Sequence, residues 1–152
     1  MIGRVGRMPL HWTIDSKERL FTCVGEGEVG IGDVLSLFDV LVAANALSYR
    51  KLFDTRAAQS TMTGEDVLAV CARARACHAQ ARMGALAMVA TAEQTLDCAR
   101  LLGVLAAADR PMKMFDGPRE ARLWLNRQTG SDGVRPGRMG GKRRPNLRPG
   151  RR

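Results

Sequence analysis

The sequence predicts an α/β fold in which an open, mixed sheet of about five strands carries about four helices. Segments with strand-like alternation, or with continuous apolar residues, are separated by longer segments whose apolar residues recur every three or four positions. The resulting order is β-β-α-β-α-β-α-β-α. Strands joined through helices of a dozen or more residues run parallel through right-handed crossovers, so most of this sheet should be parallel.

The first part of the chain predicts an antiparallel hairpin and a helix. Residues 10–14 alternate apolar and polar side chains, residues 15–18 are a polar turn, and residues 19–24 resume β-type residues. Glycines at positions 25, 27, 30 and 32 interrupt this pattern, so we expect a flexible turn over residues 25–32. A helix should then open at Asp33 and run to about Ala46. Its apolar stripe is Val34, Leu37, Phe38, Leu41 and Val42.

The middle of the chain predicts a short strand over residues 49–54 and a polar loop over residues 55–62. A helix N-cap follows at Thr63, because its hydroxyl can accept a hydrogen bond from the amide of Asp66. The helix ends at Gly84, and its apolar stripe is Val67, Val70, Cys71, Ala74, Cys77 and Ala81. The remaining expected elements are a buried central strand (85–90), a helix capped by Thr91 (92–108), a strand (112–115) and a helix opening at Gly117-Pro118.

Charge divides the chain into a nearly neutral domain and a basic tail. Residues 9–126 contain 13 basic and 14 acidic residues, whereas residues 127–152 contain 9 basic and 1 acidic. We therefore expect an N-terminal extension over residues 1–7, one domain over residues 8–127, and a disordered basic tail over residues 128–152. Met8 is a second candidate for the first residue, besides Met1.

Several features indicate a cytoplasmic protein without a cofactor or metal. The four cysteines form no C-x-x-C pair and lie in apolar segments, as buried thiols of a reducing compartment do. No apolar run reaches the roughly 20 residues of a membrane span, and no signal peptide precedes the domain. The spacing of Cys71, Cys77 and His78 fits a helical metal site poorly. The sequence shows no catalytic triad or paired-carboxylate motif, so we expect no enzyme.

Local motifs of this chain resemble the SpoIIAA-like family, a group of small STAS-related domains found in many bacterial proteins. The motifs, spread over residues 8–126, are Met8-Pro9-Leu10-His11-Trp12, Gly25-Glu26-Gly27-Glu28-Val29, Tyr49-Arg50-Lys51-Leu52-Phe53-Asp54, Met62-Thr63-Gly64-Glu65-Asp66-Val67 and Glu120-Ala121-x-x-Trp124-Leu125. The resemblance implies a STAS-like fold related to two groups. Anti-anti-sigma factors bind a kinase partner and are switched by phosphorylation of a serine at a helix N-terminus, whereas CRAL-TRIO domains bind lipids.

The resemblance implies a partner loop or phospho-switch before the second major helix. The candidate residues are Ser60, Thr61, Thr63, Glu65 and Asp66. Thr63 falls where the phosphorylatable hydroxyl of the anti-anti-sigma motif would be, but Met62 replaces the preceding acid. A phosphate on Thr63 would also be repelled by the two carboxylates that follow. An ordinary N-cap is the competing interpretation, and the sequence favours it.

Two further sites are candidates for binding. Small residues on the helices, above strands that carry methionines, predict either a ligand pocket or close packing of helices on the sheet. The candidate pocket residues are Phe53, Met88, Met112 and Met114. The tail is either an inert extension or a weak, sequence-independent contact for nucleic acid or an anionic surface. Its candidate phosphate contacts are Lys142, Arg143, Arg144 and Arg148.

The function that the sequence favours is therefore a non-enzymatic regulatory module that binds a protein partner. Binding would use the sheet edge or the loop over residues 55–63, and the exposed edge leaves a homodimer open. Carriage of a small apolar or lipid-like ligand is the first alternative. Weak nucleic-acid binding through the tail is the second.

Overall fold

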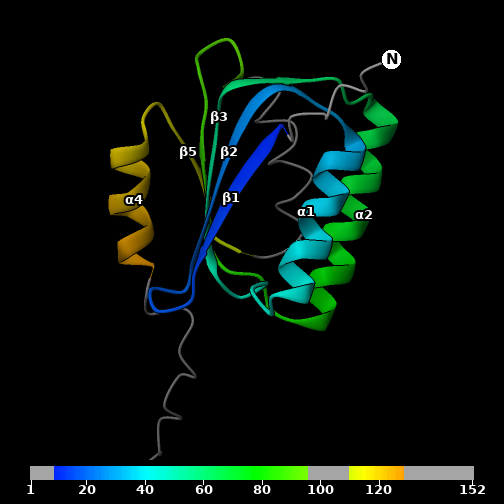
Figure 1. Ribbon diagram of the computed structural model, residues 1–152. Helices are drawn as coiled ribbons and strands as arrows, with labels where there is room; N and C mark the ends of the chain where they lie inside the picture. Colours follow the sequence, from blue (N-terminus) through cyan, green and yellow to red (C-terminus); the bar gives the residue numbers. More distant parts are fainter. Residues whose placement is uncertain (1–8, 96–109, 129–152) are drawn as a thin grey trace, which may run out of the picture.

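In the computed structural model, which describes residues 9–95 and 110–128, five strands form one sheet with helices on both faces (Figure 1). The strands are β1 (Leu10–Asp15), β2 (Leu20–Val29), β3 (Arg50–Ser60), β4 (Leu86–Val89) and β5 (Met112–Phe115). They lie side by side in chain order. β1 is antiparallel to β2, and the other neighbours are parallel. The predicted mixed sheet with an N-terminal antiparallel hairpin is confirmed.

Three helices lie within the described residues. α1 (Ile31–Ala43) and α2 (Gly64–Gln80) pack against each other on one face of the sheet, and α4 (Pro118–Arg127) covers the other face (Figure 1). The helix predicted over residues 92–108 lies outside the described residues from position 96 onward. The expected extension over residues 1–7 also lies outside them, as do residues 129–152 of the expected tail.

The two faces of the sheet have separate cores. Successive strand residues point to opposite faces, so Phe53 packs beneath α1 and α2, whereas Leu52 packs against α4. The larger core contains Phe21, Cys23, Leu37, Phe38, Leu41, Val70, Cys71, Ala74 and Cys77. The smaller core contains Leu52, Ala85, Ala87, Val89, Ala121 and Leu125. β4 is buried along its whole length, as predicted for a central strand.

β2 and β3 are both longer than the sequence predicted. The flexible turn expected at residues 25–32 and the loop expected at residues 55–62 are wrong for most of their length. Parallel pairing resumes after a register shift between Val24 and Glu26 and continues to Val29 and Ser60. Gly25 allows the two strands to approach, because a Cβ at this position would lie 2.9 Å from the Cβ of Ala58.

α1 begins at Ile31, two residues before the predicted start at Asp33, and ends at Ala43 rather than near Ala46. Its N-cap is Gly30, whose amide donates to the carboxylate of Asp33 at 2.9 Å. Asp33 therefore closes the first turn instead of preceding it. Val42, predicted to face the core, is 40% exposed, because it lies about 100° around the helix from buried Leu41.

Two buried cations fix the start of β3. The Lys51 ammonium donates to the carbonyl oxygens of Leu47 and Tyr49. The Arg50 guanidinium donates to the carbonyl oxygen of Leu125 at 3.0 Å and to that of Glu18 at 2.7 Å. Arg50 thus joins the end of α4 and the β1–β2 turn to the central strand. Such charge-assisted bonds offset the cost of burying each cation.

Candidate functional site

The carboxyl ends of the parallel strands β2 to β5 lie at one end of the sheet, where α1, α2 and α4 begin (Figure 1). Sites in open sheets of this kind form beyond the carboxyl ends of the strands. The five residues of the predicted partner loop all lie at this end, from the last residue of β3 through the β3–α2 connection to the first turn of α2. We call residues 60–66 the β3–α2 surface.

The N-cap of α2 forms as predicted. Thr63 Oγ1 accepts a hydrogen bond from the amide of Asp66 at 3.2 Å, and Asp66 Oδ2 accepts one from the amide of Thr63 at 3.0 Å. This reciprocal pair satisfies two backbone donors that the start of a helix leaves free. Thr63 and Glu65 are exposed, and Asp66 is half-buried. The cap therefore holds the polar groups of this turn in place while leaving them accessible.

Hydrogen bonds also anchor the residues that precede the cap. Thr61 donates to the carbonyl oxygen of Val29 from its amide at 3.0 Å and from its hydroxyl at 3.4 Å. Ser60 Oγ accepts a hydrogen bond from the amide of Met62 at 3.2 Å. Ser60 and Thr61 are exposed. The end of β3 is thus tied to the end of β2, and its hydroxyl-bearing side chains lie at the surface.

The side chain of Gln94 holds the second half of β3 by hydrogen bonds to its backbone. Its side-chain amide donates to the carbonyl oxygens of Thr55 at 2.7 Å and Ala58 at 2.8 Å. The side-chain oxygen of Gln94 accepts a hydrogen bond from the backbone amide of Thr91 at 2.9 Å. The backbone amide of Gln94 donates to the Thr91 hydroxyl. The Thr91 cap was predicted from the sequence, whereas the role of Gln94 was not. The T-x-x-Q spacing of a capping box was the available signal.

One ion pair, between exposed Arg56 and half-buried Asp54, lies on β3 before the β3–α2 surface. The Arg56 guanidinium donates to both carboxylate oxygens of Asp54, at 3.0 Å and 2.8 Å. These hydrogen bonds hold the pKa of Asp54 below its ordinary value, against the opposing effect of partial burial. Asp54 is therefore a firmly ionised carboxylate on this strand.

The four predicted pocket residues share one face of the sheet. Phe53, Met88 and Met114 are register partners across β3, β4 and β5, and Met112 lies two positions before Met114. Phe53 and Met112 pack on the larger core, and Met88 is buried. Close packing therefore accounts for Phe53, Met88 and Met112. The ligand pocket itself stays a prediction.

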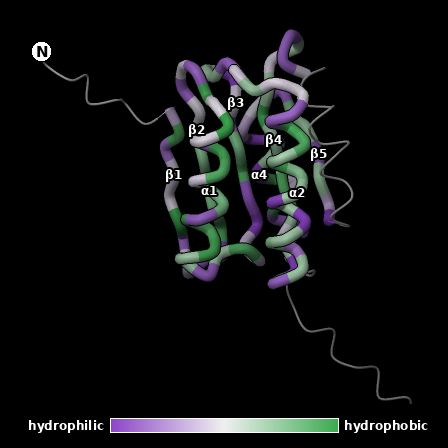
Figure 2. The backbone as a smooth tube through the Cα atoms, turned by 90° about the vertical axis from the view of Figure 1, so that its right-hand side faces the viewer, coloured by the Kyte–Doolittle hydropathy of each residue, from purple (hydrophilic) through white to green (hydrophobic). Residues whose placement is uncertain are grey.

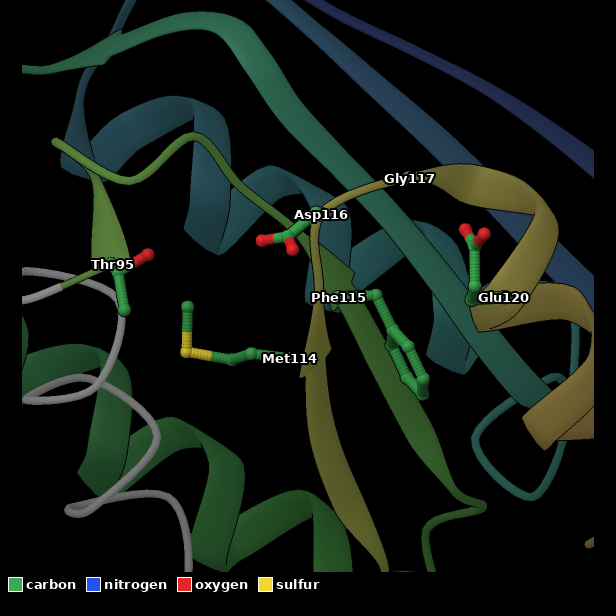
Figure 3. Close-up of a pocket in the computed structure, with 6 residues that line it drawn as sticks. All are labelled: Thr95, Met114, Phe115, Asp116, Gly117 and Glu120. Atoms are coloured by element: carbon green, nitrogen blue, oxygen red, sulfur yellow. The ribbon is translucent and has the colours of Figure 1, made fainter.

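Met114 lines a depression of about 610 Å³ where β5 meets α4 (Figure 3). The other lining residues among those described are Thr95, Phe115, Asp116, Gly117 and Glu120. Met114 extends toward Thr95, whereas Phe115 points to the α4 side, where its ring lies 5.8 Å from that of Trp124. Two carboxylates flank the depression, so its lining is more polar than the methionine pattern predicted.

Each of the two histidines has a polar neighbour, and Cys23 is buried. His11 Nε2 lies 3.8 Å from the carboxylate of exposed Glu26, and His78 Nδ1 accepts a hydrogen bond from the amide of Met83. Burial raises the pKa of the Cys23 thiol to about 12. Among residues 9–95 and 110–128, no three His, Cys, Asp or Glu side chains are grouped as metal ligands.

The tail cations Lys142, Arg143, Arg144 and Arg148 lie outside the described residues. No helix in the described part of the chain has the length and apolar character that crossing a bilayer requires.

Comparison with solved structures supplies the fold type. The structure is similar to that of an uncharacterized protein of the DUF3478 family with a SpoIIAA-like fold, from Shewanella loihica PV-4. The TM-score is 0.53 at 15% identity, over 76% of this chain and 93% of that chain. This chain has the SpoIIAA-like fold.

A second protein with a similar structure is an anti-sigma factor antagonist from Mycobacterium paratuberculosis. The TM-score is 0.50 at 14% identity, over 80% of this chain and 97% of that chain. No protein-family model matches the sequence, and no curated protein matches it significantly. At these identities the likeness concerns the fold, and the β3–α2 surface of this SpoIIAA-like fold must be judged on its own residues.

Proposed function

We propose that this protein is a non-enzymatic regulatory module that binds a partner protein through the β3–α2 surface. The observation that carries the proposal is the set of exposed polar side chains on the hydrogen-bonded turn at the start of α2. Ser60, Thr61, Thr63 and Glu65 are all exposed, and none of them packs in either core. Polar side chains that are both accessible and positioned are typical of recognition sites on rigid scaffolds.

The rigidity of this surface favours binding. The capping pair of Thr63 and Asp66 and the bonds from Thr61 to Val29 act on this surface itself, and the bonds from Gln94 hold the part of β3 that leads to it. A surface that is ordered before it meets its partner loses little conformational entropy on association. A flexible loop of the same composition would bind more weakly for this reason.

The kind of partner is suggested by the fold. One protein with a similar structure is named an anti-sigma factor antagonist, a name that denotes action on another protein. The two carboxylates in the first turn of α2 would complement a partner with a basic contact surface. The proposed partner is therefore a protein with exposed Lys or Arg residues opposite Glu65.

The test compares two charge reversals. Glu65→Lys changes the β3–α2 surface, and Glu18→Lys makes the same change in the β1–β2 turn at the opposite end of the sheet. Proteins bound by the immobilised wild-type chain are identified by mass spectrometry, and the best candidate is purified and titrated against all three chains. We expect Glu65→Lys to abolish binding and Glu18→Lys to preserve it, with both variants folded by circular dichroism. A purified partner that binds all three chains equally would refute the proposed surface.

Phosphorylation is a separate part of the proposal. A phosphate on Ser60, Thr61 or Thr63 would add about two negative charges beside Asp66 and strengthen contact with a partner that presents Lys or Arg residues. Phosphopeptide mapping of the protein from its native cells would detect it. Unmodified hydroxyls under all growth conditions would remove the switch and leave the binding surface in place.

A small-ligand function is the second candidate, and the depression beside Met114 is the observation that favours it. Its mixed lining suits a ligand that has an apolar group and hydrogen-bond donors. The carboxylates of Asp116 and Glu120 would accept hydrogen bonds from these donors. Native mass spectrometry of gently purified protein tests this candidate. A co-purifying molecule that is lost in Met114→Glu would support it, whereas a mass equal to that of the bare chain would count against it.

A further inference from the structure

The free edge of β1 is an interaction surface that the proposed function does not use. β1 lies at one margin of the sheet and pairs only with β2 among the described strands (Figure 2). An unpaired edge strand presents backbone donors and acceptors to any chain that aligns with it. Proteins usually protect such edges with proline, lysine, glycine bulges or very short strands, yet the β1 sequence LHWTID contains no Pro, Lys or Gly.

The backbone groups that point outward can be identified from one hydrogen bond. The amide of Glu26 donates to the carbonyl oxygen of Pro9 at 2.7 Å, so Pro9 belongs to the residues that bond β2. In an antiparallel pair, residues whose backbone groups bond to the neighbouring strand alternate with residues whose backbone groups point away from it. The amide and carbonyl groups of Leu10, Trp12 and Ile14 therefore point to the free edge.

These three residues are self-complementary. When β1 meets a second, antiparallel β1 with Trp12 opposite Trp12, Leu10 of each copy lies opposite Ile14 of the other. All six outward backbone groups of one copy then face partners in the second copy. On the other face of the sheet this register places His11 opposite Thr13, so no like charges oppose each other across the contact.

The side chains along this margin are suited to being covered. Trp12 is 40% exposed although its ring stacks on Phe21 at 6.3 Å between centroids. Beside it, Leu37 and Val40 of α1 line a shallow groove of about 70 Å³. Joining two β1 strands about a two-fold axis would bring both Trp12 rings to the same face and remove both from water.

We infer that this protein forms a homodimer in which the β1 strands of two copies pair antiparallel, centred on Trp12, to give one continuous ten-stranded sheet. The β3–α2 surface lies at the carboxyl ends of the parallel strands, away from this edge, so the dimer does not depend on the proposed function. Such a dimer would present two β3–α2 surfaces to its partners.

Sedimentation equilibrium of the full chain tests the dimer. We expect the mass to rise with concentration from 16.6 kDa toward twice that value. Trp12→Lys should raise the dissociation constant about 30-fold, the effect of losing a central aromatic anchor. Leu68→Lys, on an α2 residue that is 64% exposed, should leave it unchanged. A mass of 16.6 kDa at every concentration would show that the protein is a monomer and would overturn the inference.

Cross-linking tests the register independently and does not need the lysine variant to fold. Directly opposed residues of a bonded antiparallel pair have Cα atoms about 5.5 Å apart, within the range of a disulfide. Trp12→Cys should therefore form a covalent dimer on mild oxidation. Leu10→Cys, which faces Ile14 of the second copy, should not. Equal dimer yields from Trp12→Cys, Leu10→Cys and the distant control Leu68→Cys would contradict the proposed pairing.

Discussion

The Thr63 hydroxyl has a structural role that can be separated from its proposed part in binding. In Thr63→Ala the amide of Asp66 loses the acceptor that now lies 3.2 Å away, while the rest of the turn is unchanged. Replacing a capping Thr by Ala costs about 1 kcal/mol in proteins. The exposed position argues against a larger cost, because water can reach the amide that is set free.

The expected loss is measurable in a domain of this size. A change of about 1 kcal/mol lowers the Tm of a domain of roughly 120 residues by about 4 °C. Thermal and urea unfolding followed by circular dichroism would measure it, with Thr63→Ser as the matched control that keeps an oxygen acceptor. An unchanged Tm in Thr63→Ala, or an equal loss in Thr63→Ser, would refute the capping argument. If the alanine variant also loses partner binding and the serine variant does not, the hydroxyl serves both purposes.

Three other perturbations test the packing and electrostatics of the fold. Gly84→Ala should destabilise the protein by about 3 kcal/mol, because the new Cβ would overlap the carbonyl oxygens of Ser48 and Tyr49. Gly32→Ala, in open space on α1, should instead stabilise the protein by about 0.5 kcal/mol. Urea titrations of both variants check this, and equal effects would contradict it. Alkylation with iodoacetamide at pH 8, followed by peptide mass spectrometry, should leave Cys23 unmodified until the protein unfolds, since its pKa is about 12; rapid labelling in the folded state would disprove this. Asp54 has a lowered pKa, so its contribution to stability is present above the ordinary pKa of an aspartate and is lost as the pH falls through the lowered pKa of the folded state. Removing its partner in Arg56→Ala should move the acid-unfolding midpoint to higher pH, and an unmoved midpoint would show that the ion pair contributes nothing.

The sequence predicted those elements whose signals are local. Alternation in residues 10–14, continuous apolar residues in 85–90 and the Thr63 cap each depend on neighbours within a few positions, and each forms as expected. The outer halves of β2 and β3 do not follow such patterns. Their ladder forms because two segments about 30 residues apart lie in register, with Gly25 admitting Ala58. Strand propensity gives weak guidance for pairing of this kind.

The candidate site shows the same division between local and distant determinants. The position of Thr63, Glu65 and Asp66 at a helix start was predictable, since the capping box is a sequence motif. The support from Gln94 was not predicted, because it joins residues 36 to 39 positions apart. The burial of Lys51 was also unforeseeable, since lysines are almost never fully buried without specific partners.

Hydrogen–deuterium exchange with the purified partner tests whether the polar surface at the start of α2 recognises a protein. We expect slower exchange in the peptides that span residues 60–67 when the partner is added, with little change in the β1–β2 turn. Protection confined to the β5–α4 depression, or to any surface that excludes residues 60–67, would contradict it.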